Sequence, residues 1–182
     1  EIQRILTLGN QTTTDYPRDA SIPQLFEAQA ARRASQVALV EGDKEVTYQE
    51  CNARANQLAA SFLKDGLKAG SRVALCMERS ADRIIALLAI LKCGCTYVAL
   101  DPEYPIQGLK QMLEDLGPPL LLTQESLVAS FSFFTEGKTI CLDRPDNDLS
   151  QEERSNIPFH GTALTPAYIA FTSGSTGKPK GV

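Results

Sequence analysis

The last twelve residues of the chain, FTSGSTGKPKGV, combine the residue types that bind a polyphosphate. Glycines let the backbone approach a ligand closely and present its N–H donors. Serine and threonine add hydroxyl donors, and two lysines add positive charge on flexible side chains. The candidate phosphate-binding residues are Thr172, Ser173, Gly174, Ser175, Thr176, Gly177, Lys178, Lys180 and Gly181.

This loop differs from the Walker A phosphate loop, in which four residues separate glycine from Gly-Lys. Gly174 and Gly177 are separated by two residues, and Pro179 follows Lys178 directly. Proline disfavours a helical conformation in the residue before it, so no rigid helix start is expected after the loop. The sequence therefore predicts a mobile loop that closes over a phosphate.

The alternative is a flexible Gly/Ser linker, which composition alone allows. The segment before the loop decides between the two. Residues 167–171, AYIAF, show no polar alternation and predict a central strand buried on both faces. Ligands of open α/β sheets bind beyond the carboxyl ends of strands, which is where this loop is expected to lie.

The rest of the chain supplies the elements that must position the loop. Short apolar runs alternate with amphipathic segments from residue 46 onward, which predicts an α/β fold with a mostly parallel sheet and helices on its faces. The expected helices cover residues 22–33, 47–65, 81–92, 106–117 and 124–131. The expected strands cover residues 36–40 and 44–48, paired as a hairpin, then 72–77, 96–100, 119–123, 138–143 and 167–171.

Three helix ends carry local signals. Thr47 and Glu50 form the pattern of a capping box, and Ser80 can cap the helix that follows it. Asp65-Gly66 marks a glycine C-cap.

Residues 1–21 are polar and rich in turn formers, and are expected to be a linker that precedes a domain at 22–182. The polar run at 143–156 is expected to be a solvated connection.

Composition excludes several classes of protein. The 182 residues are 43% hydrophobic and 22% charged with a net charge of −4, which is typical of a globular chain and argues against a nucleic-acid partner. The longest apolar run, Ile84–Leu91, is too short to span a bilayer, so no membrane partner is expected. Five cysteines without disulfide spacing favour a reducing, cytoplasmic location. With His160 as the single histidine, Cys93 and Cys95 are interpreted as buried thiols and no metal site is expected.

Three segments in order resemble signatures of the adenylate-forming superfamily. FTSGSTGKPKGV resembles its phosphate loop, VTYQECNARANQLA its early helix, and LKCGCTYVALDPEYP a strand motif. The departures are small apolar exchanges, Cys51 for leucine, Cys93 for alanine and Ala99 for proline. NQTTTDYPRDASIPQLFEAQ resembles the linker between condensation and adenylation domains of nonribosomal peptide synthetases. The chain thus looks like the N-terminal part of such an adenylation domain, truncated at its phosphate loop.

This resemblance implies that the parent enzyme, an ATP-dependent ligase of secondary metabolite biosynthesis, activates an amino acid with ATP and Mg²⁺. Aminoacyl-AMP and pyrophosphate form, and the acyl group passes to the phosphopantetheine thiol of a downstream carrier domain. Lys178 and Lys180 would offset charge on the departing pyrophosphate, while Gly174, Gly177 and Gly181 would let the loop close. The isolated 182-residue chain is expected to be inactive. Two alternatives remain open, an acyl- or aryl-CoA synthetase and a non-catalytic interaction module.

Overall fold

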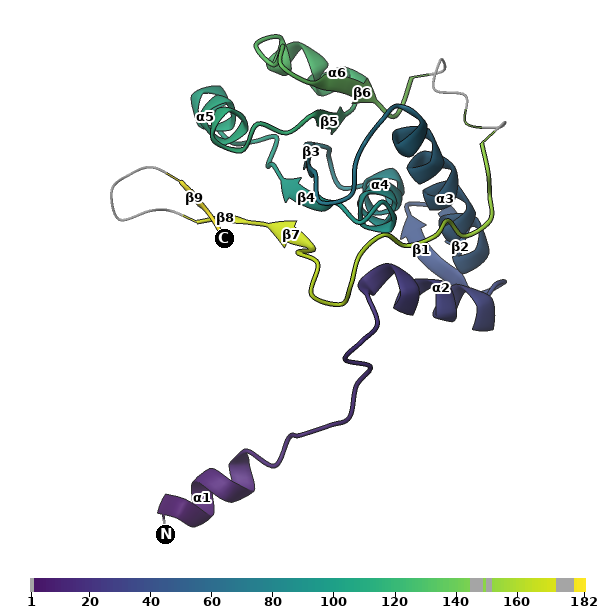
Figure 1. The fold of residues 1–182 in the computed structure, drawn as a ribbon, viewed down its shortest axis with the longest axis vertical. Coiled ribbons are helices and arrows are strands. Elements are labelled where there is room, and N and C mark those ends of the chain that lie inside the picture. Colours follow the sequence, from purple (N-terminus) through teal and green to yellow (C-terminus); the bar gives the residue numbers. More distant parts are fainter. Residues whose placement is uncertain (1, 145–148, 150–151, 173–178) are drawn as a thin grey trace.

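The computed structural model describes residues 2–144, 149, 152–172 and 179–182. Figure 1 shows a layered α/β body, an N-terminal helix on an extended arm, and a hairpin at the opposite end of the chain. The helices are α1 (Ile2–Gly9), α2 (Ile22–Arg32), α3 (Tyr48–Lys64), α4 (Ala81–Lys92), α5 (Ile106–Leu116), α6 (Glu125–Val128) and a 3-10 turn (Ala129–Phe131). The strands are β1 (Val37–Glu41), β2 (Lys44–Thr47), β3 (Arg72–Leu75), β4 (Thr96–Ala99), β5 (Leu120–Thr123), β6 (Lys138–Cys141), β7 (Tyr168–Ile169), β8 (Phe171–Thr172) and β9 (Lys180–Gly181).

The main sheet has five strands in the order β6-β5-β3-β4-β7, and every neighbouring pair is parallel. β1 and β2 form the separate antiparallel hairpin that the sequence predicts. The α/β fold with a parallel sheet is therefore confirmed. Since all five strands point the same way, their carboxyl ends share one edge of the sheet.

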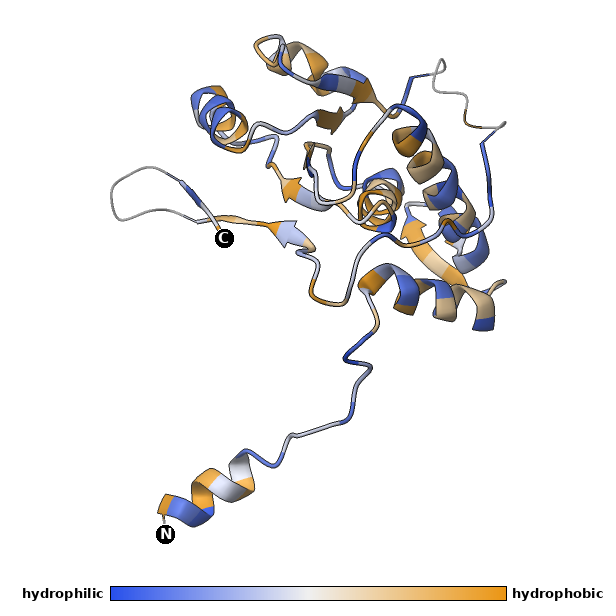
Figure 2. Ribbon diagram, in the orientation of Figure 1, coloured by the Kyte–Doolittle hydropathy of each residue, from blue (hydrophilic) through white to orange (hydrophobic). Residues whose placement is uncertain are grey.

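Helices cover both faces of this sheet (Figure 1). The core on one face joins α3 and α4 to the strands and includes Phe62, Leu75 and Ile85, each at most 1% exposed. The core on the other face joins α5 and the 3-10 turn to the strands through Leu109 and Phe131. Figure 2 shows hydrophobic residues along the inner strands and around α4, as expected for a helix that lies between layers.

Short side chains begin and end these helices. The Thr47 and Ser80 hydroxyls accept hydrogen bonds from backbone N–H groups three residues on, at 3.2 Å each. Gly66 follows α3 with φ 90°, which fits a glycine C-cap. The capping box predicted at Thr47 has only the hydrogen bond from the Glu50 N–H to the Thr47 hydroxyl. The Glu50 carboxylate accepts from Arg154 instead of from the Thr47 backbone N–H. A complete capping box begins α2, where Ser21 and Gln24 bond reciprocally.

The segment expected to be a polar, turn-rich linker starts with a helix. α1 carries Ile2, Ile5 and Leu6 at the i, i+3, i+4 spacing of an amphipathic helix, and all three side chains are exposed. Residues 11–17 lack regular structure, as expected. The expectation of turn-rich chain throughout 1–21 was therefore wrong for its first half. The division into a linker at 1–21 and a domain at 22–182 stays a prediction.

The strand expected in the centre of the sheet lies at its edge. β7 pairs only with β4 among the described strands, and Tyr168 is 57% exposed while stacking on Tyr97 at a centroid distance of 5.7 Å. Ala170 leaves the sheet and bonds to Val182 instead. Among the described strands, the run is thus an edge strand that turns into a hairpin and not the central strand that was expected, a difference that an apolar run alone does not reveal.

The buried polar groups of the body include one lysine. The Lys92 side chain is 0% exposed and pairs with Glu27 on α2. Burial lowers the pKa of Lys92, and the hydrogen bond and charge of Glu27 oppose that shift. All five cysteines are buried, and Cys93 and Cys95 form no disulfide, which confirms their interpretation as buried thiols.

Candidate functional site

The described ends of the candidate phosphate loop form the two strands of a hairpin. β8 and β9 pair antiparallel, with Phe171 opposite Gly181 and Thr172 opposite Lys180. Ala170 and Val182 exchange two hydrogen bonds of 3.0 and 2.9 Å at the base of the hairpin. β8 follows β7 directly, so the hairpin begins at the carboxyl edge of the parallel sheet, where ligands of such sheets bind.

The register of the hairpin sorts its side chains onto two faces. Directly opposite residues of an antiparallel pair project to the same side, and successive residues alternate. Phe171 packs against the core that contains α5, so Phe171 and Gly181 share the face turned toward the core, where Gly181 lies beside Ile169 while remaining exposed to solvent. Thr172 and Lys180 form the outward face, and both are exposed. The structure thus brings together a hydroxyl and an ammonium group at the mouth of the loop.

Lys180 takes part in none of the ion pairs found among the described residues. The Thr172 hydroxyl makes one long bond of 3.5 Å to the Lys180 carbonyl oxygen. Unlike Lys92, this lysine is therefore not explained by packing or by pairing within the described part of the fold.

Six predicted site residues lie outside the described residues. They are Ser173, Gly174, Ser175, Thr176, Gly177 and Lys178. The structure accordingly describes Thr172, Lys180 and Gly181 of the predicted set. Gly181 was expected to help the loop close, and the structure places it within the β8–β9 ladder, on the face turned toward the core.

A hollow of about 520 Å³ opens at the same edge of the sheet, after β3 and β4. Its charged residues follow these two strands, and they are Glu78, Arg79, Arg83, Asp101 and Glu103. Sequence reasoning did not single them out, although the ERS and DPE triplets follow two predicted strands. Two guanidinium groups against three carboxylates give the hollow no positive excess, so it is a weaker candidate for polyphosphate than the hairpin.

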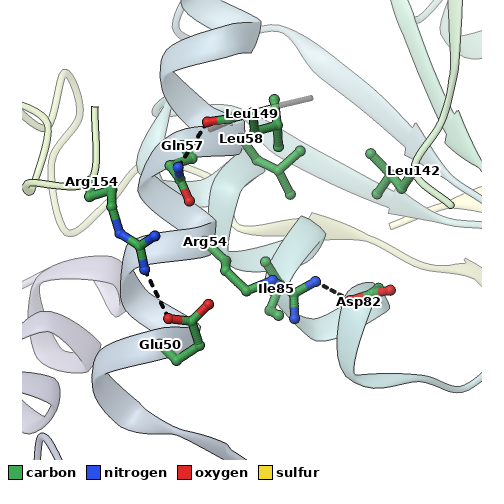
Figure 3. A pocket seen from close by; sticks show the side chains of 9 residues that line it. All are labelled: Glu50, Arg54, Gln57, Leu58, Asp82, Ile85, Leu142, Leu149 and Arg154. Carbon is green, nitrogen blue, oxygen red and sulfur yellow. Dashed lines mark hydrogen bonds and ion pairs between the residues drawn. The ribbon is translucent and has the colours of Figure 1, made fainter. Parts of the chain in front are cut away.

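A second pocket, of about 340 Å³, lies along α3 and is drawn in Figure 3. Its charged side chains neutralise one another: Arg54 pairs with Asp82, and Arg154 with Glu50 at 2.9 Å. Gln57 donates to the Leu149 carbonyl oxygen at 2.8 Å (Figure 3). The contacts of Arg154 and Leu149 dock the chain that returns after β6, the returning chain (residues 149 and 152–156), on α3. Every charged side chain that lines the pocket has a partner.

The described part of 143–156 is mostly exposed, as expected for a solvated connection, but it also docks on α3. Asn56 on α3 is 0% exposed and donates to the Arg154 carbonyl oxygen at 2.8 Å and to the Asn156 side chain at 3.1 Å. Buried amide groups need hydrogen-bond partners. The returning chain supplies them for the Asn56 NH2 group, whereas Asn56 Oδ1 has no partner among the described residues. The polar residues of α3 were the signal in the sequence that could have predicted this docking.

Metal-binding clusters and membrane-spanning helices are both absent from the described residues. Among them, no group of three or more His, Cys, Asp or Glu side chains could hold a metal ion. Within the same part of the chain, no helix is long and apolar enough to cross a bilayer.

Comparison with known proteins agrees with this geometry. The family model of the AMP-binding enzymes matches residues 26–182, and the chain therefore belongs to the AMP-binding enzyme family. Tyrocidine synthase 3 from Brevibacillus parabrevis is 42% identical over 182 residues, which are 100% of this chain and 3% of that protein. Bacitracin synthase 1 from Bacillus licheniformis is 41% identical with the same coverage of both chains. The resemblance to nonribosomal peptide synthetase adenylation domains is thus confirmed.

Solved structures show the same fold. The AMPPNP-bound form of the nonribosomal peptide synthetase FmoA3 superposes with a TM-score of 0.86 at 24% identity, covering 99% of this chain and 18% of that one. O-succinylbenzoate coenzyme A synthetase from Bacillus subtilis, in complex with AMP, gives a TM-score of 0.75 at 25% identity, covering 90% and 42%. The chain spans only a small part of the relatives that it matches.

Proposed function

We propose that this chain supplies the phosphate-binding hairpin of an amino-acid-activating adenylation domain. The observation that carries the proposal is the pairing of Thr172 with Lys180 on the exposed face of β8–β9, where Lys180 has no ion-pair partner among the described residues. The family-model match over residues 26–182 supports nucleotide chemistry at this position.

The proposed reaction has two steps. A carboxylate oxygen of the amino acid attacks the α-phosphorus of ATP, and the bond from that phosphorus to the bridging oxygen breaks and releases pyrophosphate. The thiol sulfur of a carrier-bound phosphopantetheine then attacks the acyl carbon, releasing AMP and giving up its proton to the surrounding base or solvent. The first step builds negative charge on the leaving pyrophosphate.

Lys180 would meet that charge directly. We assign Lys180 and Lys178 to the departing pyrophosphate, and the Thr172 hydroxyl, with Ser173, Gly174, Ser175, Thr176, Gly177 and Gly181, to the loop that surrounds the β- and γ-phosphates. Prearranged donors that face developing charge lower the activation barrier by about 3 kcal/mol in other enzymes. A short ladder that holds Lys180 opposite Thr172 provides such prearrangement.

The remaining partners follow from the relatives rather than from the described residues. Magnesium would enter with ATP, bound to its phosphate oxygens. An upstream condensation domain and a downstream carrier domain are proposed because the matched relatives are far longer synthases. A cytoplasmic location and a role in secondary metabolism belong to the same proposal.

The second candidate is an acyl- or aryl-CoA synthetase of the same fold. The match to O-succinylbenzoate coenzyme A synthetase favours it. The higher identity to tyrocidine synthase 3 over the whole chain, residues 1–21 included, favours the amino-acid-activating enzyme.

The test is amino-acid-dependent exchange of pyrophosphate into ATP by the complete adenylation domain that contains this chain. Lys180→Ala should slow exchange about 100-fold, the equivalent of about 3 kcal/mol. Lys44→Ala, which removes another exposed strand lysine without an ion pair among the described residues, should leave exchange unchanged. The isolated 182-residue chain should show no exchange. Equal rates for both lysine variants would contradict the assigned role.

A further inference from the structure

One glycine of the hairpin faces inward against the sheet. We propose that Gly181 is a positioning residue for Lys180: its missing side chain lets β9 lie flush against Ile169, and this sets where the Lys180 ammonium meets the nucleotide. The inference rests on the proposed role of Lys180 and adds a residue that acts through it.

The evidence is the space beside the Gly181 backbone. A Cβ atom added at Gly181 would lie 2.9 Å from Cγ2 of Ile169 and 3.7 Å from Cε1 of Phe171. Carbon atoms in favourable contact are about 3.5–4.0 Å apart. An added methyl group would therefore overlap Ile169 while making ordinary contact with Phe171.

Ile169 has little freedom to move away. β-Branched side chains are stiff about χ1, so Cγ2 cannot swing aside as the end of a long side chain would. The side chain also packs against the core beneath α5, and the backbone of Ile169 is fixed by pairing with Val98 of β4. Relief of the overlap must come from movement of β9.

A movement of β9 at Gly181 is passed directly to the neighbouring Lys180. The hairpin below is held by the two bonds between Ala170 and Val182, so β9 would tilt about this base. Tilting carries Lys180 away from its position opposite Thr172. Displacement of a catalytic group by on the order of 1 Å can cost about 100-fold in rate.

Backbone conformation does not explain this glycine. Positive φ values occur, among the residues the structure describes, at Gly42, Gly66, Gly70, Gly94 and Gly117. Gly181 is absent from that set and lies in a regular ladder. Alanine could adopt its backbone angles, so steric room is the remaining reason for glycine there.

The experiment compares Gly181→Ala with two second-site variants in the complete adenylation domain. Gly181→Ala should lower kcat for pyrophosphate exchange at least tenfold while KM for the amino acid stays within about twofold, because the fault lies at the phosphates. Adding Ile169→Ala to Gly181→Ala removes Cγ2 and should restore most of the lost kcat. The reference for this rescue is the kcat of the Ile169→Ala single variant. Adding Ile169→Val keeps a methyl group at the Cγ2 position and should restore none.

Thermal unfolding shows whether each variant is folded. This control is needed because a clash that unfolds the domain would also be relieved by Ile169→Ala and not by Ile169→Val. An unchanged kcat in Gly181→Ala, or equal rescue by both second-site variants, overturns the inference. If Lys180→Ala also leaves exchange unchanged, the proposed function fails as well. If Lys180→Ala slows exchange and Gly181→Ala does not, only the positioning role of Gly181 fails.

Discussion

Lys92 and Lys180 show how differently the body and the hairpin use the same residue type. Lys92 is fully buried, and its pairing with Glu27 joins α4 to α2. Lys180 is exposed on a two-residue strand and joins nothing among the described residues. Burial and a partner explain the first lysine, whereas the second has no ion-pair partner among the described residues and is assigned here to the proposed phosphate contact. Changes in the body should therefore alter stability, and changes in the hairpin should alter chemistry.

The largest effect on stability should come from alkaline pH, which acts on the buried thiols of the body. Burial raises the pKa of Cys51 and Cys95 from 9.0 to about 11, and that of Cys76 and Cys93 to about 12. Above about pH 9 the unfolded chain loses these protons while the folded chain keeps them, so the free energy of unfolding falls as pH rises. Each thiol contributes roughly 1 kcal/mol per pH unit in this range.

Urea unfolding of the complete domain between pH 8 and pH 11 measures this slope. Lys92 acts in the opposite direction, because its lowered pKa makes the folded state release a proton first as pH rises toward 10.5. Lys92 alone opposes the four thiols, and burial also raises the pKa of Tyr97, which acts in the same direction as the thiols, so stability falls on balance. Cys95→Ala should make the slope of the unfolding free energy against pH shallower by the contribution of one thiol, roughly 1 kcal/mol per pH unit. A flat profile up to pH 11 would contradict the role of burial.

The next largest effect should follow from breaking the buried ion pair of the body. Glu27→Gln leaves the Lys92 ammonium buried without an opposite charge, which typically costs about 3–5 kcal/mol of unfolding free energy. Glu27→Gln combined with Lys92→Met should recover much of that loss, since a buried pair can be replaced by apolar atoms. Glu152→Gln, which breaks the exposed pair with Lys64, should cost less than about 1 kcal/mol.

Urea unfolding at pH 7 compares these three variants. Equal losses for Glu27→Gln and Glu152→Gln would show that burial of Lys92 does not matter. Pyrophosphate exchange per folded molecule should stay unchanged in all three, because none of these residues lies on the hairpin.

The smallest of the three effects concerns the chain that docks on α3. Asn56→Ala removes two hydrogen bonds to residues 154 and 156, and buried hydrogen bonds contribute about 1 kcal/mol each. The free energy of unfolding should fall by about 1–2 kcal/mol. Hydrogen exchange should rise in residues 152–157 and stay constant in β3, β4 and β5. Unaltered exchange at 152–157 would mean that Asn56 does not hold this segment.

The sequence predicts the body well because its signals are local. The apolar runs of β3, β4 and β5 and the caps at Thr47 and Ser80 all lie where expected. What it missed depends on distant partners. Nothing near Glu50 reveals that its carboxylate will bond to Arg154, about a hundred residues on, instead of closing a local box.

The site was predicted in type but not in arrangement. The motif identifies Thr172, Lys180 and Gly181 as phosphate-loop residues. A motif does not show which of its residues lie opposite one another in a β-ladder. Only the ladder places Thr172 and Lys180 on one face and turns Gly181 toward Ile169. For the same reason an apolar run at 167–171 did not reveal that Ala170 pairs with Val182 rather than continuing a central strand.

Hydrogen exchange of the complete domain tests the central claim most directly, because ATP and AMP differ only in the two phosphates assigned to the hairpin. ATP with magnesium should slow exchange across residues 172–181, while AMP at saturating concentration should leave that segment unchanged. Exchange in β3, β4 and β5 should be the same with either nucleotide. Protection of residues 172–181 by AMP as strong as that by ATP, or no protection by ATP, would contradict the assignment of this hairpin to the β- and γ-phosphates.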